Sequence, residues 1–367
     1  MKKLIAGMLC AACAPLASSA GRDQCMTLLV GSYSQPGDSA LKAYSFCPAD
    51  ASARLLCAAP VSNASFLAIG PDGTIYAASE TGAESSTLST LRFDAGEPSF
   101  EVLGVQAVGG DSPCYVNVTP DGRFVVTANY GDGTVSIFPI GADGVLGQRS
   151  RLIRFEGSGP VESRQRGSHP HCIAFTPDGR YMLVDDLGTD RIHQFMLIDD
   201  DTAPVADRPD FEVVIKPGSG PRHIEFNRSG DTAYLLNEIS DSVTVLRYDG
   251  AALRPVQYVA ADTAQAHGAG DIHLSPDGKR LYASLRLRHE GIATFDVDAS
   301  TGLLTYRSHT PTGGHPRNFT ISPDGRLMFV ACRDADAVEV YAIAPDGSLS
   351  KIGSISQPRA VFVRLLD

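Results

Sequence analysis

The chain of 367 residues contains no tryptophan, and only 7% of its residues are aromatic. Without tryptophan, and without a Gly-His to Trp-Asp pattern, it does not match a WD40 repeat. Beyond the first twenty residues there is no Cys-x-x-Cys pair, so zinc-binding and thioredoxin-like chemistry have no support. A Gly-x-Ser-x-Gly nucleophile elbow is also lacking, which disfavours a covalent serine mechanism.

Long apolar runs are confined to the N-terminus. Met1-Lys2-Lys3 precedes an apolar stretch over residues 4–14 and a small-residue run that ends at Ala20, which predicts a secretory signal peptide over residues 1–20. A lipoprotein signal through Cys13 is an alternative, disfavoured by Cys10 where an aliphatic residue is expected. No other segment is long enough to span a bilayer. We therefore expect a soluble exported domain over residues 21–367, periplasmic if the source is a Gram-negative bacterium.

Positive charge is also scarce, with 31 Lys and Arg against 42 Asp and Glu. Removing Lys2 and Lys3 with the signal changes the formal charge from −11 to −13. This balance argues against binding nucleic acid or an anionic membrane through the general surface. An anionic ligand must therefore meet a local cationic pocket.

Six cysteines remain in the mature chain, an even number that permits disulfides in an oxidising compartment. Cys47 and Cys57 bracket a short connection and form the best local pair. Cys114 and Cys172 lie on adjacent repeat units, where free buried thiols are an equal alternative.

What the chain does have is a repeated turn. Pro-Asp-Gly, flanked by short apolar runs, recurs at intervals of about fifty residues and is typical of a hairpin turn in which glycine takes positive φ. Clear copies begin at Pro71, Pro120, Pro177, Pro276 and Pro323, and Arg228-Ser229-Gly230 stands in the gap. Six residues before each turn stand Ser65, Cys114, His171, Arg222, Gly270 and Arg317.

A seventh copy of the first strand, from Gln357 to Val363, ends the chain before any turn, and the run from Met26 to Tyr33 lacks an inner neighbour. A second strand also occurs seven times, at residues 41–46, 88–93, 134–140, 191–198, 242–248, 291–297 and 337–343. Short strands with this period predict an all-β, seven-bladed β-propeller with about four antiparallel strands per blade, closed by pairing the two ends of the chain. A single β-sandwich does not explain the fixed spacing.

In such a ring the strand interiors pack between blades, and only the strand ends reach the channel mouths. The first strand runs about six residues, roughly 20 Å, to its turn, and the second returns the same distance. The start of one and the end of the next therefore share the mouth opposite the turns. This mouth is predicted to collect His169, His171, Arg222, Glu238, Arg286, Arg317, Arg333 and Arg359.

Arginines, a carboxylate and an imidazole together suit an anionic or carbonyl-bearing small molecule. A purely structural interpretation is also open: Arg222 and Glu238 can pair with each other, and His171 can cap a strand. We interpret His193 and His273 as packing or surface residues, and His223 as pointing into the blade interface. Asp185 and Asp186 are expected to fix the loop that follows them.

Four ordered segments carry a family resemblance: Ser112-Pro113-Cys114-Tyr115, His169-Pro170-His171, Gly220-Pro221-Arg222-His223 with Leu236-Asn237-Glu238, and His315-Pro316-Arg317. Together they resemble the seven-bladed propeller lactonases, which include 6-phosphogluconolactonases and carboxymuconate lactonizing enzymes. The resemblance implies a site of His171, Arg222, Glu238 and Arg286. Leu285 departs from the family, which often has a polar residue there, so Arg317 is an alternative to Arg286.

The hypothesis is hydrolysis of a sugar-acid lactone without metal or cofactor. Arg222 binds the carbonyl oxygen, Glu238 or His171 handles the proton, and Arg286, Arg317 and His169 bind substrate. Because a phosphorylated metabolite is cytoplasmic, an unphosphorylated lactone fits the predicted location better. We expect a monomer whose partner is the small-molecule lactone.

Three alternatives remain. The same site would serve a lactonizing or isomerising enzyme of the carboxymuconate type, or the propeller is a non-catalytic envelope module that binds a ligand or protein. A calcium-dependent lactonase would use Asn129, Asp186 and Glu238, although the surrounding arginines would repel the ion. Glu162, Arg164 and Arg166, which precede the His169 motif, are candidates for a lid over the mouth.

Overall fold

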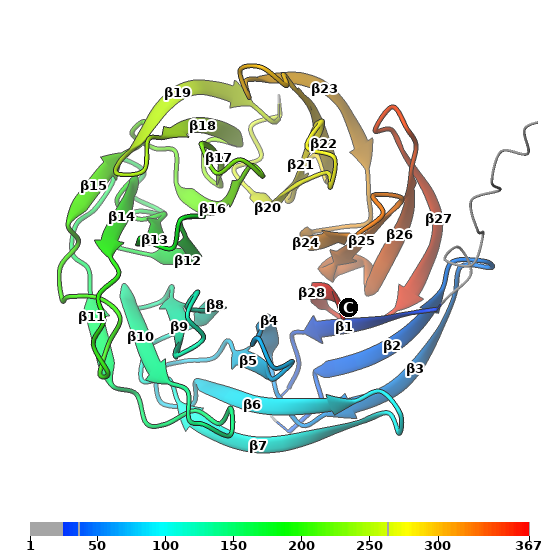
Figure 1. Cartoon of the computed structure of the whole chain (residues 1–367). Helices are drawn as coiled ribbons and strands as arrows, with labels where there is room; N and C mark the ends of the chain where they lie inside the picture. Colours follow the sequence, from blue (N-terminus) through cyan, green and yellow to red (C-terminus); the bar gives the residue numbers. More distant parts are fainter. Residues whose placement is uncertain (1–24, 36, 263, 367) are drawn as a thin grey trace, which may run out of the picture.

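The computed structural model describes residues 25–35, 37–262 and 264–366. Over these residues the chain forms seven four-stranded antiparallel sheets, arranged as blades around a central axis (Figure 1). Within the same ranges the helical element is one short 3-10 helix, η1 (Arg333–Ala335). The predicted all-β, seven-bladed propeller with four strands per blade is therefore confirmed. The predicted signal peptide lies outside the described residues.

The first three blades, each given from its inner to its outer strand, have the following bounds. Blade 1 contains β28 (Ala360–Leu366), β1 (Met26–Ser32), β2 (Leu41–Cys47) and β3 (Ser52–Ala59). Blade 2 contains β4 (Ala64–Ile69), β5 (Ile75–Ser79), β6 (Thr87–Asp94) and β7 (Ser99–Ala107). Blade 3 contains β8 (Pro113–Val118), β9 (Phe124–Asn129), β10 (Thr134–Pro139) and β11 (Arg151–Arg154).

The other four blades follow the same order. Blade 4 contains β12 (Pro170–Phe175), β13 (Tyr181–Asp186), β14 (Arg191–Met196) and β15 (Phe211–Val214). Blade 5 contains β16 (Pro221–Phe226), β17 (Thr232–Asn237), β18 (Ser242–Tyr248) and β19 (Leu253–Ala260). Blade 6 contains β20 (Ala269–Leu274), β21 (Arg280–Leu285), β22 (Gly291–Val297) and β23 (Leu304–Pro311). Blade 7 contains β24 (Pro316–Ile321), β25 (Leu327–Cys332), β26 (Ala337–Ile343) and β27 (Leu349–Ser356).

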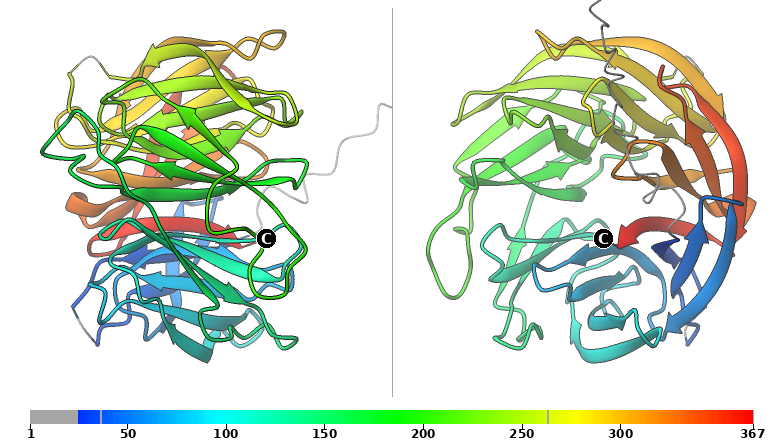
Figure 2. Two further views of the ribbon diagram at one scale, coloured as in Figure 1. Left: turned by 90° about the vertical axis from the view of Figure 1, so that its left-hand side faces the viewer. Right: turned by 45° about the vertical axis from the view of Figure 1, so that its right-hand side comes forward.

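The last strand closes the ring as predicted. β28 pairs antiparallel with β1, with Thr27 opposite Leu366 and Val30 opposite Val363. The red C-terminal strand accordingly lies against the blue N-terminal strands in Figure 2. Closure supplies the sheet edge of β1 with a partner and joins the two ends of the chain in one blade.

The repeated turn has the predicted geometry. The glycines of the five Pro-Asp-Gly copies have φ between 68° and 83°, and Gly230 of the divergent sixth copy has φ of 77°. Only glycine adopts this region readily, which explains its fixed place in the turn.

Packing between blades buries both faces of the second strands. Every residue of β9, β13 and β17 is buried, and one apolar cluster joins blades 3 and 4 through residues such as Val126, Ile137, Met182 and Phe195. Strands that are covered on both faces have no surface to offer a ligand. Function is therefore left to the strand ends and the loops.

The predicted cysteine pair is wrong. Cys25 and Cys47 form a disulfide, and Cys57 is free. The register explains the difference: Met26 lies opposite Phe46 in the β1–β2 pair, which brings their outer neighbours together, whereas Cys57 lies opposite Ala43. Cys114 and Cys172 are free buried thiols, one of the two predicted states.

Candidate active site

The structure contains the channel mouth that the strand directions predict, where the first strand of each blade starts and the second ends. The first residue of each inner strand lies opposite the last residue of the next strand, as in the pairs Pro170 with Asp186, Pro221 with Asn237, and Pro316 with Cys332. The Pro-Asp-Gly turns lie at the opposite end of the same strands. Side chains at the start of one strand and just past the end of the next therefore gather at one opening.

A register shift near the start of every inner strand gives the mouth its side chains. In β12, β16 and β24 the extra residue is His171, Arg222 and Arg317, respectively. The equivalent shifts in the other blades fall at Ser65, Cys114, Gly270 with Asp271, and Val361. A bulge of this kind bends the strand and redirects one side chain. The repeat position identified from the turns is thus the bulge position.

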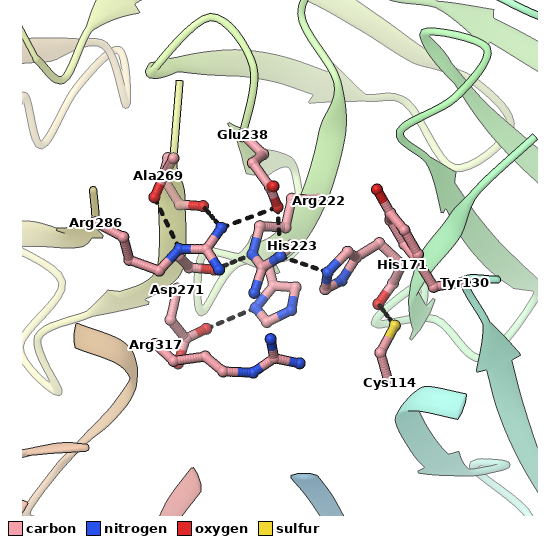
Figure 3. Close-up of polar contacts among 12 residues, drawn as sticks. Cys114, Tyr130, His171, Arg222, His223, Glu238, Ala269, Asp271, Arg286 and Arg317 are labelled. Carbon is pink, nitrogen blue, oxygen red and sulfur yellow. Dashed lines mark hydrogen bonds and ion pairs between the residues drawn. The ribbon is translucent and has the colours of Figure 1, made fainter. Parts of the chain in front are cut away.

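Glu238, just after β17, contacts both Arg222 and Arg286, as the dashed lines in Figure 3 mark. Its Oε2 accepts from Arg222 Nη1 at 2.5 Å and lies 3.1 Å from Arg286 Nη2, while its Oε1 accepts from Arg164 Nη2 at 2.5 Å. Arg222 also donates from Nη1 to His171 Nε2. We call His171, Arg222, Glu238 and Arg286 the Glu238 cluster; their exposed fractions of 2–6% show that it is withdrawn from bulk water.

Backbone carbonyls fix the two arginines of the Glu238 cluster. Arg286 donates from Nε to Gly268 O at 2.8 Å and from Nη2 to Ala269 O at 2.9 Å. Arg222 donates from Nε to Gly270 O. A Cβ at Gly270 would come within 2.5 Å of Ser284 Oγ and 2.9 Å of Pro316 O, so glycine is required there. Both guanidinium groups are therefore held in place before any ligand binds.

The charges of the cluster depend on one another. Burial alone would raise the pKa of Glu238, but Arg286 and Arg222 outweigh it and hold that pKa well below its ordinary value. Burial and the charge of Arg222 lower the pKa of His171 well below its ordinary value, so its imidazole is neutral. Burial and Arg222 lower the pKa of Arg286 to about 9, which shows how costly this cation is to hold. One carboxylate thus balances several buried cations.

A second polar cluster lies at the other side of the mouth, and we call it the Glu80 cluster. Glu80, just after β5, accepts from Tyr33 Oη at 3.0 Å and from Arg317 Nη2 at 2.8 Å. The guanidinium groups of Arg317 and Arg359 lie 5.3 and 5.5 Å from the Tyr33 ring centroid. Burial raises the pKa of Tyr33, so the phenol keeps its proton. The sequence analysis missed Tyr33 and Glu80 as functional candidates, although Glu80 follows the second strand of its blade, β5, as Glu238 follows β17.

His169 borders the Glu238 cluster without entering it. Its ring stacks on Tyr130 at 4.5 Å, its Nδ1 lies 2.7 Å from Tyr130 O, and its backbone N–H donates to Asp186 Oδ1 at 2.7 Å. Of the proposed lid residues, Arg164 reaches Glu238, whereas Glu162 and Arg166 form an exposed pair with each other. Counting along the strands could not predict the contact of Arg164 with Glu238, because Arg164 lies in a loop.

The remaining predicted mouth residues have other partners. Arg333 pairs with its neighbour Asp334. Asn129 donates to Thr134 and Ser136, and Asp186 accepts from Ser168, His169 and Gly188, so each is bonded within its own blade and neither joins Glu238 as a calcium site would require. Asp186 fixes its loop as expected.

The histidines outside the mouth also behave largely as expected. His193 is buried, stacks on Phe155 and hydrogen-bonds to Asp186. His223 bonds across the blade interface to Asp271. His273 lies between Asp271 and Glu225. Among the residues that the structure describes, no helix has the length and apolar character needed to cross a bilayer.

Comparison with known proteins places this arrangement in a family. The sequence model of the family described as Lactonase, 7-bladed beta-propeller, matches residues 27–365. The chain belongs to this lactonase family. The prediction of a lactonase-type enzyme is thereby confirmed at the level of the family.

Individual relatives of this lactonase match over most of their length. The 6-phosphogluconolactonase of Formosa agariphila is 31% identical over 323 residues, 86% of this chain and 91% of the relative. The 6-phosphogluconolactonase of Bacillus subtilis is 32% identical over 349 residues, 92% and 97% of the two chains. The structure of the Pseudomonas aeruginosa periplasmic gluconolactonase superposes with a TM-score of 0.87 and 30% identity, covering 94% of this chain and 99% of that one.

Proposed function

We propose that this lactonase hydrolyses a sugar-acid lactone, without a metal ion, at the Glu238 cluster. The observation that carries the proposal is the direct contact of Arg222 with both His171 and Glu238, beside Arg286. Fixed guanidinium donors and a neutral imidazole are the two components that water addition to an ester carbonyl requires. The concentration of arginine would repel a divalent cation, which favours this route over a calcium-dependent one.

In the first step the lactone carbonyl oxygen accepts hydrogen bonds from Arg222 and Arg286. As water adds to the carbonyl carbon, negative charge develops on that oxygen, and the two guanidinium groups stabilise it. Because backbone carbonyls already fix both arginines, little reorganisation accompanies the reaction. One such donor typically contributes about 10²–10³-fold to the rate.

His171 moves the protons. Arg222 occupies its Nε2 lone pair in the free enzyme, and that lone pair becomes available when the substrate carbonyl engages Arg222. Nε2 then takes a proton from the attacking water and returns one to the ring oxygen as the ring carbon–oxygen bond breaks. The product is the hydroxy acid, which ionises to its carboxylate and releases one proton.

We do not assign proton transfer to Glu238, which the sequence analysis gave as an alternative to His171. The arginines that lower its pKa make its carboxylate a weak base. We assign it to holding Arg164, Arg222 and Arg286 together against their mutual repulsion. His171 is therefore our candidate for the proton acceptor.

The Glu80 cluster favours an unphosphorylated substrate. Arg317 is already paired with Glu80, and a phosphate brought to Arg317 would meet that carboxylate. A carboxylate, a guanidinium and a phenol are well suited to the hydroxyl groups of a sugar chain. The relatives bear names of both kinds, 6-phosphogluconolactonase and gluconolactonase, so the substrate must be decided by measurement.

We also propose that the protein works in the periplasm, on the sequence of residues 1–20 and on the Cys25–Cys47 disulfide, since disulfides persist in oxidising compartments. Cell fractionation of a tagged full-length chain tests the location, and recovery with cytoplasmic markers would contradict it.

The test of function is proton release by the purified mature chain with a panel of sugar lactones, with and without phosphate, each with and without chelator. We expect chelator-insensitive turnover that favours the unphosphorylated lactones. Chelator-sensitive turnover would indicate the calcium mechanism, and no turnover on any lactone would favour a ligand-binding propeller.

A further inference from the structure

Behind the Glu238 cluster, a line of polar side chains joins blades 5 and 6; His223 and Asp271 are buried, and His273 and Glu225 are partly exposed. His223 Nδ1 lies 2.7 Å from Asp271 Oδ1, and His273 Nε2 lies 3.1 Å from Asp271 Oδ2. His273 Nδ1 lies 2.9 Å from Glu225 Oε2. His223 and Glu225 are two residues apart on β16, as are Asp271 and His273 on β20, so each pair shares one face of its strand.

Asp271 is an ionised carboxylate. Besides the two histidines, it accepts from Asn318 Nδ2 at 2.5 Å and from the backbone N–H groups of Ile272 and Phe319. Burial would raise its pKa, but His273 and His223 outweigh burial and keep that pKa below its ordinary value. An ionised carboxylate only accepts hydrogen bonds, so the Nδ1 atom of His223 must carry a proton.

The tautomers of the two neighbouring histidines follow from their partners. Arginine only donates, so Arg222 leaves Nε2 of neutral His171 without a proton and puts that proton on Nδ1. Neutral His223, protonated on Nδ1, has a free lone pair on Nε2. Both His171 Nδ1 and His223 Nε2 are buried and have no hydrogen-bond partner among the described residues. One is a donor and the other an acceptor.

The imidazole rings of His171 and His223 are direct neighbours. Their centroids lie 5.3 Å apart at an interplanar angle of 61°, a separation that a small ring rotation or one bridging water spans. In Figure 3 His223 lies between Asp271 and His171.

We infer that Asp271 and His223 are positioning residues that act through His171: as His171 Nε2 takes the proton of the attacking water, His171 Nδ1 passes its own proton to His223 Nε2. His171 stays neutral, and the positive charge appears on His223 beside Asp271. When the ring oxygen leaves, it takes the Nε2 proton of His171, and His223 returns the other proton to Nδ1. This inference rests on the proposed lactone hydrolysis.

Electrostatics favours this placement of charge. Six side chains from five strands or the loops that follow them face His171: Arg222, Glu238, Arg317, Tyr130, Cys114 and His223. An imidazolium at His171 would thus stand beside Arg222, which already shares the Glu238 carboxylate with Arg164 and Arg286. His223 instead contacts Asp271, and the two carboxylates flanking His273 leave that side net negative even when His273 is charged. Burial lowers the pKa of His223 to about 4 although Asp271 opposes this, whereas at His171 the charge of Arg222 acts in the same direction as burial.

Nitrogen-15 NMR of the wild-type imidazoles tests the tautomers without any substrate. We expect His171 protonated on Nδ1 and His223 protonated on Nδ1 with a bare Nε2. A proton on Nε2 of His171 or of His223 would overturn the relay, because neither the donor nor the acceptor would then be in place.

Kinetics tests the transfer itself. His223→Gln keeps a donor for Asp271 but cannot accept a proton, and we expect kcat to fall roughly 10²-fold with KM nearly unchanged. The dependence of kcat on the deuterium fraction of the solvent should change from curved, with two protons moving, to linear. Tyr115→Phe is the matched control, since its ring packs on His223 at 5.2 Å and only a hydroxyl is lost; its kcat and curvature should stay as in wild type.

The outcomes separate the two proposals. Unchanged kcat in His223→Gln, or a lower kcat with the curvature retained, would overturn the relay while leaving lactone hydrolysis intact. Absence of turnover by the wild type on every lactone would overturn the proposed function, and the relay with it.

Discussion

The two carboxylates of the mouth are placed alike and partnered differently. Glu238 and Glu80 each follow the second strand of a blade, but Glu238 meets three guanidinium groups, whereas Glu80 meets one guanidinium and one phenol. The Glu238 cluster therefore keeps an excess of positive charge for an oxyanion, while Glu80 balances the charge of Arg317 and holds the neutral phenol of Tyr33. One repeated fold position has thus become an electrostatic site on one side and a polar binding site on the other.

Glu238→Gln should have the largest effect on stability, because it leaves several buried cations without their carboxylate. We expect the free energy of unfolding to fall by about 3–5 kcal/mol, measured by denaturant titration. The control is Glu162→Gln, which breaks an exposed pair with Arg166 and should cost at most about 1 kcal/mol. Equal losses in the two variants would contradict the buried-charge account.

Glu80→Gln should give the Glu80 cluster an excess of positive charge, as the Glu238 cluster has. Removing the carboxylate frees Arg317 to meet an anion, so the ratio of kcat/KM for a 6-phosphorylated lactone to that for its unphosphorylated counterpart should rise about tenfold. Steady-state kinetics on both lactones measures this ratio, with Glu162→Gln again as the control. An unchanged ratio would show that Glu80 does not select against phosphate.

A third buried acid, Asp185, forms no salt bridge with any other residue that the structure describes, unlike Glu238. Asp185 lies in blade 4, and burial raises its pKa to about 8 from an unfolded value of 3.8. Between pH 4 and pH 8 the folded state therefore binds more protons than the unfolded state. The contribution of protonated Asp185 to the free energy of unfolding is complete below about pH 4 and is lost as the pH rises toward 8. Glu238, equally buried, stays ionised because arginines surround it.

Asp185→Asn should accordingly change melting temperature in a pH-dependent way. The melting temperature of the variant minus that of the wild type should rise between pH 4 and pH 8 and then level off. The rise should be roughly 2 °C for each kcal/mol that the wild type loses by ionising Asp185. Thermal unfolding at a series of pH values measures this, with the exposed Asp201→Asn as control. A difference that is constant with pH would contradict the raised pKa.

Much of this comparison could be predicted from the sequence, because each repeat of the sequence corresponds to one blade of the same geometry. The Pro-Asp-Gly turn sets the strand register, and counting back from it finds the bulge position, so His171, Arg222 and Arg317 were correctly placed at one mouth. Glu238 and Arg286 followed from the same count along the second strand. Regular strands make distance along the chain a reliable measure of position in space.

What could not be predicted comes from contacts that the repeat does not specify. Arg164 reaches Glu238 from a loop of irregular length, and Glu80 meets Arg317 across the ring closure, 237 residues away in sequence. The cysteine pairing was wrong for a related reason: proximity in sequence favoured Cys57, whereas the β1–β2 register brought Cys25 to Cys47. Side-chain partners between blades depend on packing detail that spacing alone does not carry.

The most direct test compares two arginines of the same mouth. Arg222 is buried in the Glu238 cluster, whereas Arg333 pairs only with its neighbour Asp334 among the described residues. Measured as proton release on the preferred lactone, Arg222→Ala should lower kcat/KM by about 10²–10³-fold, and Arg333→Ala should leave it within about twofold. A folded Arg222→Ala variant with wild-type turnover would contradict the assignment of lactone hydrolysis to this cluster.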